Sequence, residues 1–152
     1  VAGPWQFGKV DQGVVAHWVK AHLFGSKLSY IGYGGTGKQV RDVLHVADLC
    51  ELMEQQVRDF DAWEGWVGNV AGGCKNSVSL LELTSLCQEA TGAKIEMSSI
   101  SQTRPADLRL FIADCSRLFS RSSWRSRRSI QTIVEETCQW AKDHRTDLLR
   151  LN

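Results

Sequence analysis

The chain lacks a long apolar run, an excess of one charge and any closely spaced pair of cysteines. No apolar run approaches the ~20 residues that a membrane-spanning helix needs, so we expect no membrane association. No charged segment precedes an apolar one, and no secretory signal peptide is visible. Lys and Arg number 18 against 17 Asp and Glu, a formal net charge of +1. No global field therefore favours nucleic acid as a partner.

The five cysteines form no CxxC motif, and the histidines show no metal-ligand spacing. An odd number of scattered thiols predicts reduced cysteines in a cytoplasmic protein. His17 and His22 are five positions apart, which places them on different helix faces. His45 and His144 stand alone. We therefore expect no metal site, and no serine, cysteine or carboxylate pair has a recognisable catalytic spacing.

The hydrophobic pattern alternates between strand and helix periods, which predicts an α/β fold within one domain over residues 1–152. Strands are expected over residues 28–31, 94–100 and 108–113. Residues 39–46 should form a short strand or an extended segment, and residues 65–73 a buried strand followed by a glycine turn. Helices are expected over residues 12–25, 47–60, 79–92 and 130–144, with Asp11 as the first N-cap and Ser79 and Glu82 forming a capping box. The second helix should carry Leu49, Leu52, Met53 and Val57 on one face.

The densest glycine cluster lies within residues 28–49 and admits two nucleotide-loop interpretations. Gly32 to Gly37 fits the dinucleotide fingerprint GxGxxG, and Gly32 to Lys38 fits the first seven positions of a P-loop. Both loops need a helix directly after the glycines, but the segment that follows looks extended. A P-loop also needs Ser or Thr where this chain has Gln39. We favour a plain turn between two strands and keep a P-loop-like nucleotide hydrolase as a remote alternative.

Two arginines are candidates for binding an anion. Arg41 stands in an apolar extended run, where a buried guanidinium needs a negative partner. Asp42 is adjacent in the same run and should point to the opposite face, which leaves room for an external anion such as a pyrophosphate. Arg104, three positions before Asp107, is a second candidate. The alternative, which composition alone favours, is an ordinary ion pair within the chain.

A second basic stretch covers residues 117–129, where Arg117, Arg121 and Arg125 recur every four positions. This spacing could form a nucleic-acid stripe with Trp124 as a stacking platform. The balanced net charge favours a solvated surface instead, so we expect no nucleic-acid binding.

Four motifs together resemble one enzyme family. They read AGPWQFGKVDQG, GKQVRDVLHVADL, VGNVAGG and TRPADLRLFIADCSR, and they follow one another in that order. They resemble the extended short-chain dehydrogenase/reductase family, the NAD-dependent nucleotide-sugar epimerases and dehydratases. The GPWQFG opening and KQVRD look most like its CDP-paratose (CDP-tyvelose) 2-epimerase branch.

The resemblance implies the C-terminal, substrate-binding portion of an extended short-chain dehydrogenase/reductase fold. The family's N-terminal Rossmann half carries a glycine-rich NAD loop and a Tyr-x-x-x-Lys pair. Residues 1–152 of this chain contain neither. The chain also begins without Met. We therefore expect no catalytic residue here, no cofactor bound by this chain alone, and NAD in the complete enzyme.

The same resemblance assigns roles to individual residues. Arg41 and Arg104 match the arginines that grip the diphosphate of the nucleotide-sugar, with Asp107 in the second motif. The other matches are Tyr30 to Gly32 beside the base, Gln12 and Gly13 beside the nucleotide, and Gly3 and Pro4 beside nicotinamide and sugar. Loss of a Rossmann half should expose apolar surface, which favours a homo-oligomer or a Rossmann-containing partner. The main alternative is a free-standing binding or assembly module without catalysis.

Overall fold

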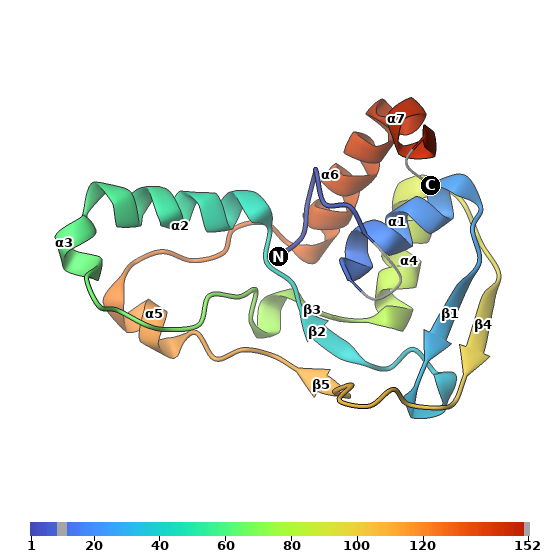
Figure 1. The fold of residues 1–152 in the computed structure, drawn as a ribbon, viewed down its shortest axis with the longest axis horizontal. Helices are drawn as coiled ribbons and strands as arrows, with labels where there is room; N and C mark the ends of the chain where they lie inside the picture. The colour runs from blue at the N-terminus through green and yellow to red at the C-terminus, as the bar shows by residue number, and fades with distance from the viewer. Residues whose placement is uncertain (9–11, 151–152) are drawn as a thin grey trace.

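The computed structural model describes residues 1–8 and 12–150 (Figure 1). Its elements follow the order α1 (Val14–Phe24), β1 (Leu28–Ile31), η1 (Tyr33–Gly35), β2 (Val40–Asp42), α2 (Val46–Arg58), α3 (Phe60–Trp63), η2 (Cys74–Asn76), β3 (Ser77–Ser79), α4 (Leu80–Thr91), β4 (Met97–Ile100), β5 (Leu110–Phe111), α5 (Ser116–Arg121), α6 (Ile130–Asp143) and α7 (Arg145–Arg150). The alternation of short strands and helices confirms the expected α/β class.

Helices α1, α4 and α6 pack together to form the main core. Val19, Cys87 and Ile133, one from each helix, are completely buried in it. Helix α4 begins where expected, because Ser79 accepts from the Glu82 N–H while the Glu82 carboxylate accepts from the Ser79 N–H. These helices form the solid support against which strand β1 and the cavity described below are built.

The strands form two small sheets. β1 pairs with β4 in parallel from Leu28 opposite Met97 to Ile31 opposite Ile100. The second sheet has the order β3-β2-β5, in which β2 is antiparallel to β3 and parallel to β5. Arg41 therefore stands in the middle of the central strand, where its backbone is fixed from both sides.

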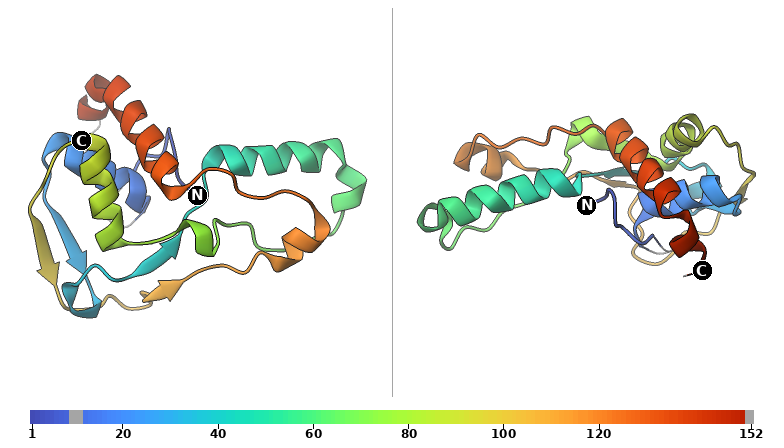
Figure 2. Two further views of the ribbon diagram at one scale, coloured as in Figure 1. Left: turned by 180° about the vertical axis from the view of Figure 1, so that it is seen from behind. Right: turned by 90° about the horizontal axis from the view of Figure 1, so that it is seen from above.

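The remaining elements extend from the core as an arm. Helices α2, α3 and α5 lie at one end of the elongated molecule, and α1, α4, α6 and α7 lie at the other (Figures 1 and 2). The arm has its own small cluster, formed by Leu44, Leu52, Leu118 and Trp124. The fully buried carboxylate of Asp48 accepts from the backbone N–H groups of Arg127 and Arg128 and from the Arg128 guanidinium. This bond set ties the start of α2 to the segment before α6.

One sequence expectation for the arm is wrong. Residues 65–73 were expected to form a buried strand followed by a glycine turn, but the segment contains no strand, and Val67 is 74% exposed. A strand needs a neighbour for its N–H and C=O groups, and no described strand pairs with this segment. Met53 and Val57 of the expected apolar face of α2 are 54% and 77% exposed, because that side of the helix is uncovered in the described chain.

Two helix starts also differ from expectation. Helix α5 was not expected, because its sequence is basic and serine-rich; the Asp114 carboxylate accepts from the Ser116 N–H at its start. Asp11, the expected N-cap of α1, lies outside the described residues. Gly13 occupies the N-cap position in the left-handed conformation, with φ 68°.

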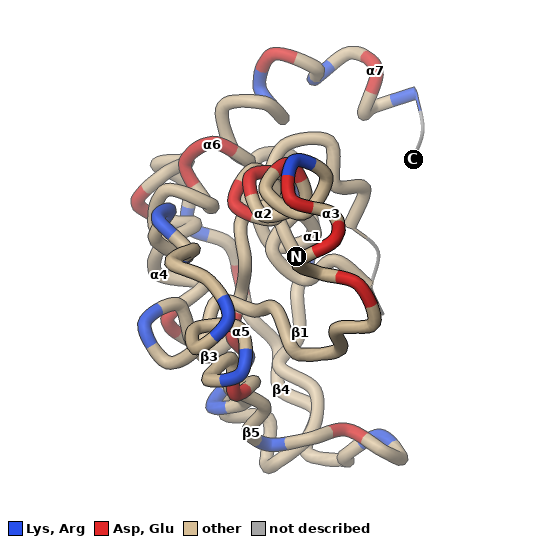
Figure 3. The backbone as a smooth tube through the Cα atoms, turned by 90° about the vertical axis from the view of Figure 1, so that its left-hand side faces the viewer, with Lys and Arg blue, Asp and Glu red and all other residues tan. Residues whose placement is uncertain are grey.

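The basic stretch at 117–129 lies against the acidic helix α2. Figure 3 shows Asp and Glu gathered on α2 and α3. Arg128 pairs with Asp48 and with Glu51, and Arg125 lies over the Phe119 ring at 4.1 Å. Trp124, expected as a possible stacking platform, is buried and donates its indole N–H to the Asp48 carbonyl, so the ring is not free to stack on a base. Among the described residues, no helix is long and apolar enough to cross a membrane.

Candidate functional site

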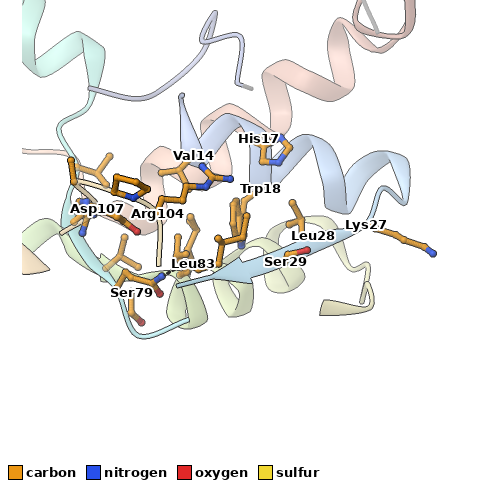
Figure 4. A pocket seen from close by; sticks show the side chains of 18 residues that line it. Val14, His17, Trp18, Lys27, Leu28, Ser29, Ser79, Leu83, Arg104 and Asp107 are labelled. Carbon is orange, nitrogen blue, oxygen red and sulfur yellow. Dashed lines mark hydrogen bonds and ion pairs between the residues drawn. The ribbon is translucent and has the colours of Figure 1, made fainter. Parts of the chain in front are cut away.

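A cavity of about 590 Å³ opens between α1, β1, β2 and the loop at residues 101–109 (Figure 4). Its lining residues come from segments far apart in the sequence, which the two small sheets bring together. They are Val14, His17, Trp18, Lys27, Leu28, Ser29, Ile31, Gln39, Arg41, Val43, Val78, Ser79, Leu80, Leu83, Arg104, Pro105, Ala106 and Asp107.

The cavity has apolar walls and a charged margin. Trp18, Leu28 and Leu83 are buried side chains on its inner wall. The indole N–H of Trp18 donates to Thr84 Oγ1 at 3.0 Å, which fixes the orientation of the ring. Lys27 and Arg104 are exposed, and the Lys27 side chain extends away from the other lining side chains in Figure 4. This combination suits a ligand with a flat or apolar portion and an anionic portion.

Arg41 and Asp107 form an ion pair within this cavity. Arg41 Nη2 lies 2.8 Å from Asp107 Oδ1, and Arg41 Nη1 donates to its own neighbour, the Val40 carbonyl, at 2.8 Å. Both side chains stay partly exposed, at 33% and 27%. A guanidinium carries five N–H donors, so Arg41 keeps donors for a further acceptor. The internal ion pair and a ligand-binding role are therefore compatible.

Arg104 lines the same cavity as Arg41. The loop that carries it turns at Arg104, whose carbonyl accepts from the Asp107 N–H at 3.2 Å. Figure 4 shows the Arg104 side chain beside Val14 of α1. Its guanidinium makes no hydrogen bond or ion pair with any residue in the described part of the chain. It is a cation available to an anionic ligand.

Several polar residues of the cavity were not predicted from the sequence as site residues, among them His17, Lys27 and Gln39. His17 lines the wall from α1. Burial, as the larger cause, and the charge of the nearby Lys20, as the smaller, lower the pKa of His17 from its ordinary value of 6.5, which favours the neutral imidazole at pH 7. Lys27 adds a third cation. Gln39 donates its amide to the Ile31 carbonyl at 2.5 Å, which holds β1 beside β2. No local motif marks these residues, because only the folded topology brings them to one cavity.

Tyr30 and Gly32, predicted beside the base, do not line the cavity. The Tyr30 hydroxyl donates to Thr84 Oγ1 at 2.8 Å, and the ring is buried in the core. A Cβ on Gly32, at φ 87°, would lie 3.3 Å from Thr103 Cα, so Gly32 borders the loop that carries Arg104. Base contacts by these two residues stay a prediction.

The remaining predicted residues also lie outside the cavity lining. Gly3, at φ 141°, packs against Val46 and the His45 ring, where a Cβ would lie 3.0 Å from the nearest atom. Pro4 follows it in a turn, half-buried. Gln12 is exposed, and Gly13 caps α1. Their roles beside nucleotide, nicotinamide and sugar stay predictions.

The glycine turn does not fit the phosphates of NAD or of a nucleoside triphosphate. The chain passes from Gly37 into strand β2, so no helix N-terminus faces a phosphate. A Cβ on Gly35 would lie 1.9 Å from Ser99 Oγ, and a Cβ on Gly37 would lie 2.9 Å from the Tyr30 ring. These glycines serve close packing within the chain. The described residues also contain no cluster of three or more His, Cys, Asp or Glu that could hold a metal.

Comparison with known proteins identifies relatives that share this portion of structure. The chain is 31% identical over 140 residues to CDP-paratose 2-epimerase from Salmonella typhi and 30% identical over 131 residues to UDP-glucose 4-epimerase from Erwinia amylovora. These matches cover 91% and 86% of the chain. The solved UDP-glucose 4-epimerase from Thermus thermophilus, in complex with NAD, matches 92% of the chain with a TM-score of 0.74 and 23% identity.

The chain is similar to these epimerases and shares the fold of the C-terminal portion of an extended short-chain dehydrogenase/reductase. It spans 41% of the length of the Salmonella relative, 37% of the Erwinia relative and 43% of the Thermus structure. A dTDP-glucose 4,6-dehydratase from Bacillus anthracis shares the fold with a TM-score of 0.73 at 22% identity. No protein-family model matches the chain.

Proposed function

We propose that this chain provides the nucleotide-sugar-binding pocket of an NAD-dependent nucleotide-sugar 2-epimerase that acts on a CDP-linked sugar. The observation that carries the proposal is the convergence of Arg41 and Arg104 on one cavity with apolar walls. With Lys27 at its edge, three cationic residues line the cavity, and Asp107 is the one carboxylate among the described lining residues. This excess of positive charge suits a diphosphate, which arginine binds through paired N–H donors.

The similarity to curated epimerases supports the assignment to sugar nucleotides. A CDP-paratose 2-epimerase and a UDP-glucose 4-epimerase both match most of this chain at about one residue in three. The base and the sugar are proposed as cytosine and a tyvelose- or paratose-type sugar from the first of these relatives. All five cysteines are free thiols, which supports a cytoplasmic location.

The complete enzyme would use NAD to oxidise and re-reduce one carbon of the sugar. The glycine turn of this chain does not fit NAD, and the sequence contains no Tyr-x-x-x-Lys pair for proton transfer. The role of this chain is to bind and orient the nucleotide-sugar. We expect no epimerisation by the purified chain with added NAD, and a measurable 2-epimerase rate would contradict this.

Thermal shift with CDP, UDP and Mg-ATP tests the binding role. We expect CDP to raise Tm, since a ligand at 100 times its Kd stabilises a protein by about 2.7 kcal/mol. Arg41→Ala should abolish the shift, and Arg104→Ala should reduce it. The matched control is Arg58→Ala, which removes a surface arginine on α2 that is 79% exposed and far from the cavity. Its CDP shift should equal that of the unmodified chain.

Two other outcomes would favour the alternative functions. Indifference to every nucleotide would favour a free-standing binding or assembly module. Stabilisation by Mg-ATP alone would revive the nucleotide hydrolase suggested by the GxxxxGK string.

A further inference from the structure

Within the glycine-rich turn, Tyr33 makes two hydrogen bonds to the loop that carries Arg104, one from its backbone and one from its side chain. The Tyr33 N–H donates to Thr103 Oγ1 at 3.0 Å, and the Tyr33 hydroxyl donates to the Asp107 carbonyl at 2.5 Å. Thr103 and Asp107 stand on either side of Arg104 in the sequence. One residue of the turn therefore holds both ends of the segment from which Arg104 projects.

The backbone on both sides of this contact is strained. Tyr33 has φ 49° and Ala106 has φ 62°, the left-handed region that residues with a Cβ rarely adopt. They are two of the three non-glycine residues with positive φ in the described chain. Such conformations persist only where surrounding contacts enforce them, and they concentrate at ligand-binding segments. The contacts between the turn and the loop therefore enforce the unusual backbone conformations of both segments.

We propose that Tyr33 is a positioning residue, which fixes residues 103–107 across the cavity opening so that Arg104 faces a bound diphosphate. Tyr33 itself does not line the cavity. The inference rests on the proposed function, because it is read out through diphosphate binding. It also gives the glycine turn a role: the turn presents Tyr33 to the loop and does not hold phosphate itself.

A hydrogen bond and an ion pair together hold Asp107 in place. Its carbonyl accepts from Tyr33, and its carboxylate pairs with Arg41 at 2.8 Å. Removing the hydroxyl leaves the ion pair and the Thr103 contact in place, so the loop should loosen without coming free. The net contribution of a neutral hydrogen bond is modest. Removing the Tyr33 hydroxyl should therefore lower the affinity for CDP roughly threefold to tenfold.

The test compares variants that each remove one hydroxyl. Tyr33→Phe should weaken binding of CDP and of inorganic pyrophosphate, measured by isothermal titration calorimetry, and lower the Tm of the ligand-free chain only slightly. Thr137→Val is the control, because its buried hydroxyl bonds to the Ile133 carbonyl within α6 and does not line the cavity. It should leave the affinity for CDP unchanged. Thr103→Val, which removes the other hydrogen bond of Tyr33 to this loop, should weaken binding as Tyr33→Phe does.

A double-mutant cycle separates positioning from a general structural role. If Tyr33 acts by placing Arg104, then Tyr33→Phe should cost no further affinity in an Arg104→Ala background. An equal loss in both backgrounds would overturn the proposal. So would unchanged CDP affinity in Tyr33→Phe while Arg41→Ala still abolishes binding, which leaves the proposed function intact. Absence of CDP binding by the unmodified chain would overturn both.

Discussion

At the scale of single residues, the site depends on one pair that sequence reasoning could only half predict. The isolated position of Arg41 in an apolar strand indicated an anionic partner. That partner, Asp107, lies 66 positions away, and only the parallel pairing of β2 with β5 brings the two together. The local sequence thus indicates that Arg41 needs a negatively charged partner, and the pairing of the strands determines which residue that partner is.

The five thiols differ sharply in their surroundings, which gives a direct test of the structure. Cys50 and Cys74 are exposed, whereas Cys87, Cys115 and Cys138 are buried. Burial, with Cys138 nearby, raises the pKa of Cys87 to about 12, and burial also raises the pKa of Cys115. Because the thiolate is the reactive form, two thiols should react rapidly with Ellman's reagent at pH 8 and three slowly.

The control for this measurement is the double variant Cys50→Ser with Cys74→Ser, which should lose the rapid phase entirely. In denaturant all five thiols of the unmodified chain should react at once. A third rapid thiol in the native chain would show that part of the core is open.

At the scale of elements, the N-terminal capping box of helix α4 contains a titratable group, the carboxyl of Glu82. Hydrogen bonds from the Ser79 side chain and N–H lower the pKa of Glu82 from its ordinary value of 4.5. A carboxyl whose pKa is lowered in the folded state stabilises the fold above pH 4.5 and loses that contribution as the pH falls through the lowered value. The difference in Tm between the unmodified chain and Glu82→Gln should therefore shrink from pH 7 to pH 3. A constant difference would contradict the capping box.

The link between α2 and the segment before α6 should be the costliest one to break. Asp48 is fully buried and holds two backbone N–H groups and the Arg128 guanidinium. We expect Asp48→Asn to lower the free energy of unfolding in urea by about 2–3 kcal/mol, below the usual cost of breaking a buried pair because Arg128 is partly exposed. Glu51→Gln removes the outer partner of the same arginine and should cost less than about 1 kcal/mol.

Elements with local signals were predictable, and elements that depend on distant neighbours were not. The capping box at Ser79 and the glycine stop at Gly92 mark α4 unambiguously, and both occur where the sequence places them. Residues 65–73 have strand-like composition but form no strand, since a ladder needs a partner that this part of the chain does not supply. In the cavity, the two arginines were predictable from charge in an apolar or proline-bounded context. His17 and Lys27 were not, because nothing local distinguishes them.

At the scale of the whole molecule, the arm presents apolar side chains that nothing in the described chain covers. Met53 and Val57, four positions apart on α2, are 54% and 77% exposed, and Phe60 at the start of α3 is 70% exposed. Val67 adds a fourth exposed apolar side chain in the segment that follows. An uncovered apolar face of this kind favours association, either with a Rossmann-containing partner or with a second copy of the chain.

Light scattering of the purified chain over a range of concentrations measures this tendency. We expect self-association that increases with concentration and that decreases in the double variant Val57→Ser with Phe60→Ser, because polar side chains remove the gain from burying that face. Leu149→Ser on α7 is the matched control, since Leu149 is also exposed, at 52%, but lies at the opposite end of the molecule (Figure 1). It should leave association unchanged. A monomer at every concentration would contradict self-association through these exposed apolar side chains.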